Sequence, residues 1–423
     1  MNLVITSCGA VTPVGIGREA TWRALSNGIS GVGRITKEFA QKPGYPIQIA
    51  GEVSDWDPKK QIPWVDREVR RFMHRSAQFA EFASREAKEQ AGLLKVPDVG
   101  YKYDTVNLIG TGAAGSDQYE HMTRAVDKKV GAKIRPTLSI QVIANTFQSV
   151  LAKTIGSDQQ YTLNTACATS GDSMRLAALF LLSEADVVPV TVAYTGGGDA
   201  AISETQISSF WGLGALSTRN DAPEKASRPF DKDRDGFVMG EGAVVLIVER
   251  EDFAKQRGAK PIARFIGWSS ICREGHSTDP DLGDMVETIN RALEQAKRYP
   301  EDIDLIVAHG TSTLKNDATE TEAIKKCYGN RATKIPVTAP KSMVGHMLGS
   351  AGSLNALVAI KAIQTGIIPP TINYETPDPK CDLDYVPNVA RTNQRVRTVA
   401  IHAWGFGNQN SVLIFEGFDG WRV

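Results

Sequence analysis

Apolar and polar positions follow two rhythms along the whole chain. Short runs rich in β-branched residues alternate with segments of helical spacing, which is typical of an α/β protein with buried strands. The clearest helical spacing covers residues 66–92, where Asp66 can cap the helix. Ala-rich segments near 172–184 and 350–364 predict two further helices. The apolar face of the first helix is predicted to hold Phe72, Phe79, Ala80, Ala83 and Ala87.

Three predicted strands run directly into residues that can do chemistry. Residues 161–166 lead into Cys167, and residues 304–308 lead into His309. Residues 399–403 lead into Trp404 and the glycine-flanked Phe406. Ligands of open α/β sheets gather at the carboxyl ends of strands. We therefore expect distant parts of the chain to form a single site.

Composition excludes several classes of protein. The chain has 423 residues, 42% hydrophobic and 23% charged, as in an ordinary soluble globular protein. This length predicts two or three domains, or one large duplicated unit. Lys+Arg and Asp+Glu both number 48, so no whole-molecule field attracts nucleic acid or a membrane, and a charged partner would need a local patch.

The cysteines and the N-terminus point to a reducing compartment. The five cysteines are scattered, without the CxxC pairs of zinc or redox sites and without a disulfide framework. The N-terminus lacks the features of a signal peptide, and no run approaches the roughly 18 to 20 apolar residues of a membrane span. We expect a cytoplasmic protein with no metal and no membrane segment. The cysteines are Cys8, Cys167, Cys272, Cys327 and Cys381.

Two segments imitate cofactor motifs. Gly110–Gly115 fits the dinucleotide pattern G-x-G-x-x-G, but Arg135-Pro136 stands where an acid is expected. A tight turn against the core explains it better. Asp231–Gly236 begins like a calcium-binding loop, but Gly242 occupies the position of the bidentate glutamate. We interpret it as a charged structural turn.

Cys167 is the strongest candidate nucleophile. It lies where an apolar strand is predicted to turn into an Ala- and Leu-rich helix. A helix N-terminus stabilises a thiolate, and its free N–H groups can serve an oxyanion. The alternative is a buried cysteine that acts as a small hydrophobe. His309 and His346 both lie among glycines and small polar residues, which favours a shared catalytic site over two structural histidines.

Seven segments together carry a resemblance to one family. They are Val4–Gly15, Ala166–Ser170, Leu216–Asp221, Arg228–Gly242, His309–Thr313, Lys341–His346 and Gly405–Gly407. In this order, and over nearly the whole chain, they are similar to the elongating β-ketoacyl-acyl-carrier-protein synthases of fatty-acid and polyketide synthesis, in the thiolase superfamily.

The resemblance implies a thiolase fold. Two similar halves, each with a mixed five-stranded sheet, would stack as α-β-α-β-α layers. Residues 1–258 would form the half with the cysteine, and residues 259–423 the half with the histidines and Lys341. Members form dimers with themselves or with a related chain such as a chain-length factor. They take substrates from the phosphopantetheine of an acyl carrier protein and need no other cofactor.

The resemblance also implies catalytic roles. Cys167 would accept the acyl group, while His309 and His346 would promote malonyl decarboxylation and hold the enolate. Two imidazole donors can stabilise an enolate oxygen, and the charge of Lys341 can tune the field around them. Glu320 would be a supporting acid near Lys341.

Further roles concern the pocket and the partner. Thr311 and Thr313 would contact pantetheine, and Phe406 would act as a gate. The N–H groups of Phe406 and Cys167 would form an oxyanion hole. Ala113 and Phe210 would line the acyl pocket. The carrier would dock on a basic patch formed by Arg67, Arg70 and Arg71. The alternative is that these arginines are only part of a solvated helix face.

Some residues depart from the family pattern. The usual Asn-Ser-Phe-Gly-Phe-Gly-Gly-Thr-Asn appears as His402–Asn410, with Asn408 in place of a glycine. Asp172 replaces a small residue or histidine, and Ala113 replaces a bulky aliphatic residue that often closes the acyl pocket. We therefore expect a specialised polyketide, polyene or unusual acyl pathway, and medium, long or unsaturated acyl chains.

Two other hypotheses stay open. A thiolase-like enzyme or a Cys-His acyltransferase would transfer the acyl group without loss of CO2. A non-elongating partner subunit would only shape the pocket of a heterodimer, but Cys167, His309, His346 and Lys341 are all present, which argues against it.

Overall fold

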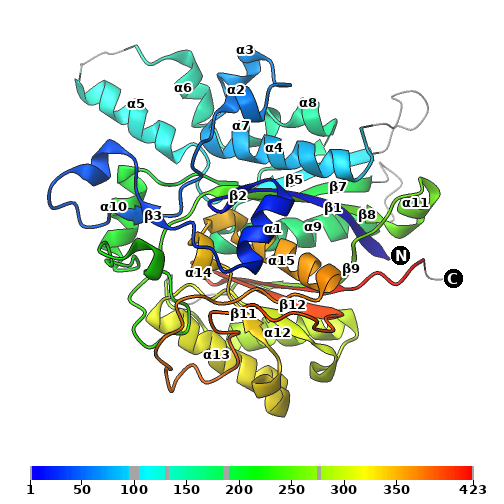
Figure 1. Ribbon diagram of the computed structural model, residues 1–423. Coiled ribbons are helices and arrows are strands. Elements are labelled where there is room, and N and C mark those ends of the chain that lie inside the picture. Colours follow the sequence, from blue (N-terminus) through cyan, green and yellow to red (C-terminus); the bar gives the residue numbers. More distant parts are fainter. Residues whose placement is uncertain are drawn as a thin grey trace.

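The strands of the computed structural model form two runs of five (Figure 1). The structure describes residues 2–94, 104–128, 133–157, 159–183, 190–273 and 278–421. The first run is β6-β5-β7-β8-β1 and the second is β11-β10-β12-β13-β9. In both runs the first two pairings are parallel and the last two antiparallel. The chain therefore repeats one topology, which confirms the predicted pair of mixed sheets.

The two runs share one edge. Residues Leu3–Ile5 of β1 pair with Ala263–Phe265 of β9, so this short pairing joins the two five-stranded sheets at one edge. The first run holds β1 (Leu3–Thr12), β5 (Asp104–Gly110), β6 (Gln159–Gln160), β7 (Val190–Asp199) and β8 (Gly242–Arg250). The second holds β9 (Ala263–Ile271), β10 (Leu305–Val307), β11 (Val337–Thr338), β12 (Thr398–Gly405) and β13 (Gln409–Glu416). The short strands β2 (Gly15–Ile16), β3 (Gly33–Arg34) and β4 (Ile49–Ala50) lie outside these runs.

Helices complete five layers (Figure 1). Helix α4 (Arg75–Gln90) covers the outer face of the first sheet, and α12 (Leu282–Ala296) and α13 (Leu314–Tyr328) cover the second. Helices α9 (Thr169–Leu182) and α15 (Ala351–Thr365) lie between the sheets. Every residue from Ala351 to Ala362 is buried, including the polar Ser353, Asn355 and Lys361, because the helix is covered on both sides.

Shorter elements surround these layers. The remaining helices are α1 (Arg18–Ser26), α2 (Pro58–Gln61), α3 (Arg67–Arg70), α5 (Ser116–Lys128), α6 (Pro136–Gln141), α7 (Thr146–Ser149), α8 (Ala152–Ile155), α10 (Glu204–Gly212), α11 (Glu251–Gln256) and α14 (Lys341–Val344). The 3-10 turns are η1 (Glu38–Gln41), η2 (Ala166–Ala168), η3 (Pro223–Lys225), η4 (Pro300–Asp302), η5 (Gly329–Lys334) and η6 (Leu348–Ser350). In the described part of the chain, no helix combines the length and apolarity needed to cross a membrane.

Two sequence-based predictions of elements were wrong. The helix expected over 66–92 is broken into α3 and α4, because the His74 side chain accepts the N–H of Ala77 and starts a new helix. The strand expected over 161–166 does not form, and the strand next to it is the two-residue β6, which ends at Gln160. After β6 only isolated backbone hydrogen bonds, such as Thr111 N–H to the Leu163 carbonyl at 3.0 Å, hold the chain against β5. The helices predicted near 172–184 and 350–364 are present as α9 and α15.

Candidate active site

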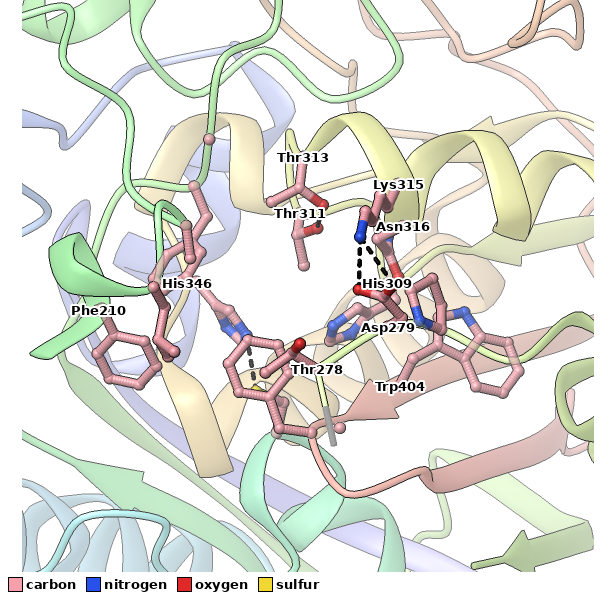
Figure 2. Close-up of a pocket in the computed structure, with 18 of the residues that line it drawn as sticks. Phe210, Thr278, Asp279, His309, Thr311, Thr313, Lys315, Asn316, His346 and Trp404 are labelled. Atoms are coloured by element: carbon pink, nitrogen blue, oxygen red, sulfur yellow. Dashed lines mark hydrogen bonds and ion pairs between the residues drawn. The ribbon is translucent and has the colours of Figure 1, made fainter. Parts of the chain in front are cut away.

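Equivalent positions of the two halves meet at one cavity of about 370 Å³. Cys167 precedes α9, and His346 precedes α15, its counterpart in the second half. His309 follows β10. Figure 2 shows both imidazoles directed into this space, with a hydrogen bond joining His346 to the Cys167 sulfur. The structure thus brings together the three residues that the sequence singled out.

A strained turn presents the cysteine. Ala166 has a φ of 50°, a left-handed conformation that is costly for a residue with a side chain. Thr169 Oγ1 holds the turn by accepting the Thr165 N–H at 2.9 Å and donating to the Ala166 carbonyl at 2.6 Å. As a result the Cys167 Sγ lies at the cavity wall, 3.0 Å from His346 Nε2.

The resting cysteine is a thiol. Burial raises the pKa of Cys167 from 9.0 to about 11, although the Lys341 charge and hydrogen bonds from the backbone N–H groups of Phe406 and Cys167 lower it. The expected thiolate at the start of α9 is therefore wrong for the resting site, since a residue only 9% exposed has lost its hydration. The same two N–H groups converge on the sulfur, where they can stabilise the oxyanion of an attached acyl group.

His346 is held as a hydrogen-bond donor. Its Nδ1 accepts the backbone N–H of Leu348 at 3.2 Å, and a neutral imidazole that accepts at Nδ1 carries its proton on Nε2. Burial, followed by the Lys341 charge, lowers the pKa of His346 well below 6.5. The ring is therefore neutral at pH 7, and its Nε2–H donates to Cys167.

Lys341 gives His309 the same tautomer. Its Nζ lies 3.3 Å from His309 Nδ1 and donates to the His309 carbonyl at 2.5 Å. Burial lowers the pKa of Lys341 to about 8, against the opposing charge of Glu320, so the ammonium predominates at pH 7. Because an ammonium donates, His309 Nδ1 accepts and the proton resides on Nε2. Burial and the Lys341 charge also lower the pKa of His309 well below 6.5.

Glu320 organises the segment behind His309. Its carboxylate accepts the N–H groups of His309 and Gly310, each at 2.9 Å, and lies 3.1 Å from Nδ1 of His402. Burial alone would raise the pKa of Glu320, but the His402 hydrogen bond and these backbone groups keep it below its ordinary value. The carboxylate stays ionised and favours the charged form of Lys341.

The predicted pocket residues lie on different walls. The hydroxyls of Thr311 and Thr313 are 2.9 Å apart at the cavity wall. Phe406 lies in the tight turn between β12 and β13, with its ring 6.4 Å from that of Phe210. Asn408 in this turn has a φ of 54°, a conformation that asparagine tolerates better than most residues. The loop thus keeps a tight turn without the family's glycine.

Ala113 and Asp172 lie outside the cavity lining. Ala113 donates its N–H to Asp199 at 2.8 Å and packs in a cluster with Phe237 and Leu348, which do reach the cavity. Ala113 is therefore behind the wall, and the prediction that it lines the pocket was wrong. Asp172 is buried in the first turn of α9 and is hydrogen-bonded to Ser270.

The three arginines lie on or beside α3, also away from the cavity lining. Arg67 and Arg71 are exposed, and Arg71 forms an ion pair with Glu68 at 2.5 Å. Arg70 is partly buried and donates to the carbonyl of Pro58 at 3.2 Å. Two of the three guanidinium groups are thus open to solvent.

Both cofactor-like motifs have structural explanations. At Gly110 a Cβ would come within 2.2 Å of the Thr169 side chain, so this turn packs tightly against the core. Asp231 pairs with Arg228 at 2.9 Å and accepts the N–H of Asp233 at 2.8 Å. The charged segment is an internally paired turn, as predicted.

Three residues of the site were missed in the sequence. Asp199, at the end of β7, accepts the N–H groups of Gly112 at 3.0 Å and Gly349 at 2.7 Å, and it ties the turn after β5 to η6 beside His346. Its position directly after three glycines was the available signal. His402 was noted only as a departure from the family pattern. Trp404 was noted at the end of a predicted strand but was given no role, although both residues are buried at the site.

Known proteins match this chain both in sequence and in structure. The N-terminal domain of β-ketoacyl synthases matches residues 2–254, and the C-terminal domain matches residues 263–375. A 3-oxoacyl-[acyl-carrier-protein] synthase 2 of Synechocystis is 38% identical and covers 99% of this chain and 98% of its own. Two solved structures cover 99% of both chains with TM-scores of 0.87: the ishigamide ketosynthase/chain length factor, at 32% identity, and a type II polyketide synthase acyl-carrier protein in complex with its ketosynthase, at 30%. The chain therefore belongs to the β-ketoacyl synthase family.

Proposed function

We propose that this enzyme condenses an acyl group with malonyl-acyl carrier protein, with loss of CO2. The observation that carries the proposal is the matched tautomer of the two histidines. The Leu348 N–H and the Lys341 ammonium each occupy an Nδ1 atom, so both Nε2–H groups are donors at the cavity that holds Cys167. Two such donors suit the oxygen of a thioester enolate.

Acyl loading is the first half-reaction. The Cys167 sulfur attacks the acyl thioester, the bond to the phosphopantetheine sulfur breaks, and the thiol proton ends on the departing thiol. The N–H groups of Cys167 and Phe406 receive the negative oxygen of the tetrahedral intermediate.

Condensation is the second half-reaction. The malonyl thioester oxygen accepts from His309 and His346, the bond to the carboxylate breaks, and CO2 leaves with the electron pair remaining as an enolate. The enolate carbon attacks the acyl group on Cys167. The resulting intermediate expels the sulfur, which regains a proton, and a β-ketoacyl thioester departs on the carrier.

The rival enzyme hypothesis fits the site less well. A Cys-His acyltransferase needs a histidine that accepts the thiol proton. In its neutral form His346 presents Nε2–H to the sulfur, because the Leu348 N–H occupies Nδ1. A non-elongating subunit would need none of these contacts. The geometry therefore favours decarboxylative condensation.

Partners, location and organisation follow from the same proposal. The substrates arrive on the phosphopantetheine of an acyl carrier protein, and the chain forms a dimer with a second copy or a related ketosynthase chain. The named relatives, a fatty-acid-type synthase and polyketide ketosynthases, support either pathway. All five cysteines are free, which suits the reducing cytoplasm. We place the boundary between the halves at residues 258/259, between the two matched domains.

The acyl chain is proposed to extend along the Phe210 wall. Phe210 packs with Phe237, and Leu348 belongs to the same apolar cluster. Each additional CH2 buried there contributes about 0.8 kcal/mol, which favours medium or long acyl groups over acetyl.

The two half-reactions can be measured separately. His309→Ala should retain acyl loading of Cys167, followed by intact-protein mass, but lose CO2 release from malonyl-carrier protein. His346→Ala should also lose CO2 release. His121→Ala, on the surface helix α5, is the matched control. Normal CO2 release by His309→Ala would contradict the proposed role of the histidine pair.

A further inference from the structure

One buried donor at the cavity has no partner within the part of the chain that the structure describes. Trp404 is 5% exposed and contributes to the cavity wall, yet its Nε1–H makes no hydrogen bond to any described residue. A buried N–H without an acceptor costs free energy, so native proteins almost always provide one. The missing acceptor is expected from a molecule that enters the cavity.

Trp404 lies on the side of the cavity away from Phe210, with the two imidazoles between them (Figure 2). Met285 and Asn316 also line the cavity, and Met285 shares an apolar cluster with Trp404. The nearby charges are already paired, because both oxygens of Asp279 lie 2.7 Å from the Lys315 ammonium. This lobe therefore combines the apolar Met285 with an ion pair that is already formed, and the indole N–H is an unsatisfied donor among the described residues.

The other parts of the substrates have different walls. The acyl chain on Cys167 has the aromatic cluster around Phe210, and pantetheine has Thr311 and Thr313. The malonyl thioester oxygen is taken by the two histidines. The group that remains is the malonyl carboxylate, which needs a hydrogen-bond donor close to His309.

We propose that the Trp404 Nε1–H donates a hydrogen bond to the carboxylate of the malonyl unit before decarboxylation. This inference rests on the proposed function and deepens it. The family pattern has phenylalanine at this position, so the donor distinguishes this chain. A single donor at this buried wall orients the carboxylate without fully solvating it, and the charge is relieved when neutral CO2 forms.

The prediction separates binding from chemistry. The hydrogen bond is made to the carboxylate and is lost as CO2 forms, so its removal should weaken malonyl binding more than turnover. Hydrogen bonds to charged groups of this kind correspond to about tenfold or more in affinity. Acyl loading of Cys167 involves no carboxylate and should not change.

Trp404→Phe tests this directly, because it removes the N–H and keeps an aromatic ring. KM and kcat for CO2 release from malonyl-carrier protein and the rate of acyl loading should be measured for the wild type and this variant. Trp421→Phe, near the C-terminus, is the matched control. We expect KM to rise about tenfold or more, with kcat unchanged or higher and the loading rate little changed.

Two outcomes would overturn the inference. An unchanged KM would do so. If Trp404→Phe left KM unchanged but lowered Tm, the indole would instead pair inside the protein, for example through water to His402 Nε2, which has no partner among the described residues. An equal loss of loading and CO2 release would indicate a structural role. Failure of the wild type itself to release CO2 would instead contradict the proposed function, which distinguishes the two.

Discussion

Measuring the pH dependence of Cys167 ionisation tests how strongly burial controls the pKa of this thiol. Burial raises the pKa of the thiol from 9.0 to about 11, which makes the thiolate about a hundredfold rarer at a given pH, or about 3 kcal/mol less favourable. Lys341 opposes this effect. Its pKa is lowered to about 8, so its charge supports the thiolate below pH 8 and fades above it.

Lys341→Met is the informative perturbation. A charge that acts on a thiol in a buried site of effective dielectric about 20 contributes on the order of 2 kcal/mol, so the variant should form the thiolate about tenfold or more less readily below pH 8. Above pH 9 the two proteins should converge, because the wild-type lysine is then neutral. Wild-type reactivity should keep rising beyond pH 9 without a plateau.

The assay is alkylation by iodoacetamide from pH 6 to 9.5, followed by peptide mass spectrometry. Cys272 is exposed and supplies an internal reference in the same sample. The shape of the pH profile, rather than the absolute rate, is compared, so restricted access to the cavity does not affect the result. A plateau for Cys167 near or below pH 7 would refute the dominance of burial and restore the thiolate expected from the helix N-terminus.

Three further predictions concern loading, docking and chain length. Cys167→Ser should abolish condensation because a serine alkoxide is far less accessible than a thiolate. Peptide mapping of the wild type should find the acyl group on Cys167, and an acyl group on another cysteine would contradict the assignment. Arg67→Glu with Arg71→Glu should raise the carrier's KM and weaken its salt dependence, whereas Arg397→Glu serves as control; identical KM values at low ionic strength would leave α3 as an ordinary solvated helix. Ala113→Ile should push Phe237 or Leu348 into the cavity and shift preference toward shorter acyl chains with decarboxylation intact; equal chain-length profiles would show that the pocket is limited elsewhere.

The sequence by itself determined the chemistry and the class of fold. The segments around Cys167, His309 and His346 are local, and alternating strands and helices already predict an α/β protein whose strand ends carry ligands. Helices α9 and α15 were predicted from alanine content alone. Local patterns succeed here because the residues that must be close to the reaction are next to recognisable turns.

Only the tertiary structure decided the ionisation states and the walls of the site. The direction of the Cys167 pKa shift depends on burial by segments far away in the chain. The helix start alone suggested a lowered pKa, whereas burial raises it. The tautomers of His309 and His346 depend on Lys341 and the Leu348 N–H, whose positions follow from packing of the two halves. The structure places Ala113 behind the cavity wall and divides the predicted helix over 66–92 at His74. It also leaves the Trp404 Nε1–H without a partner among the described residues. Each depends on three-dimensional neighbours, because hydration and hydrogen-bond partners are properties of the packed molecule rather than of the local sequence.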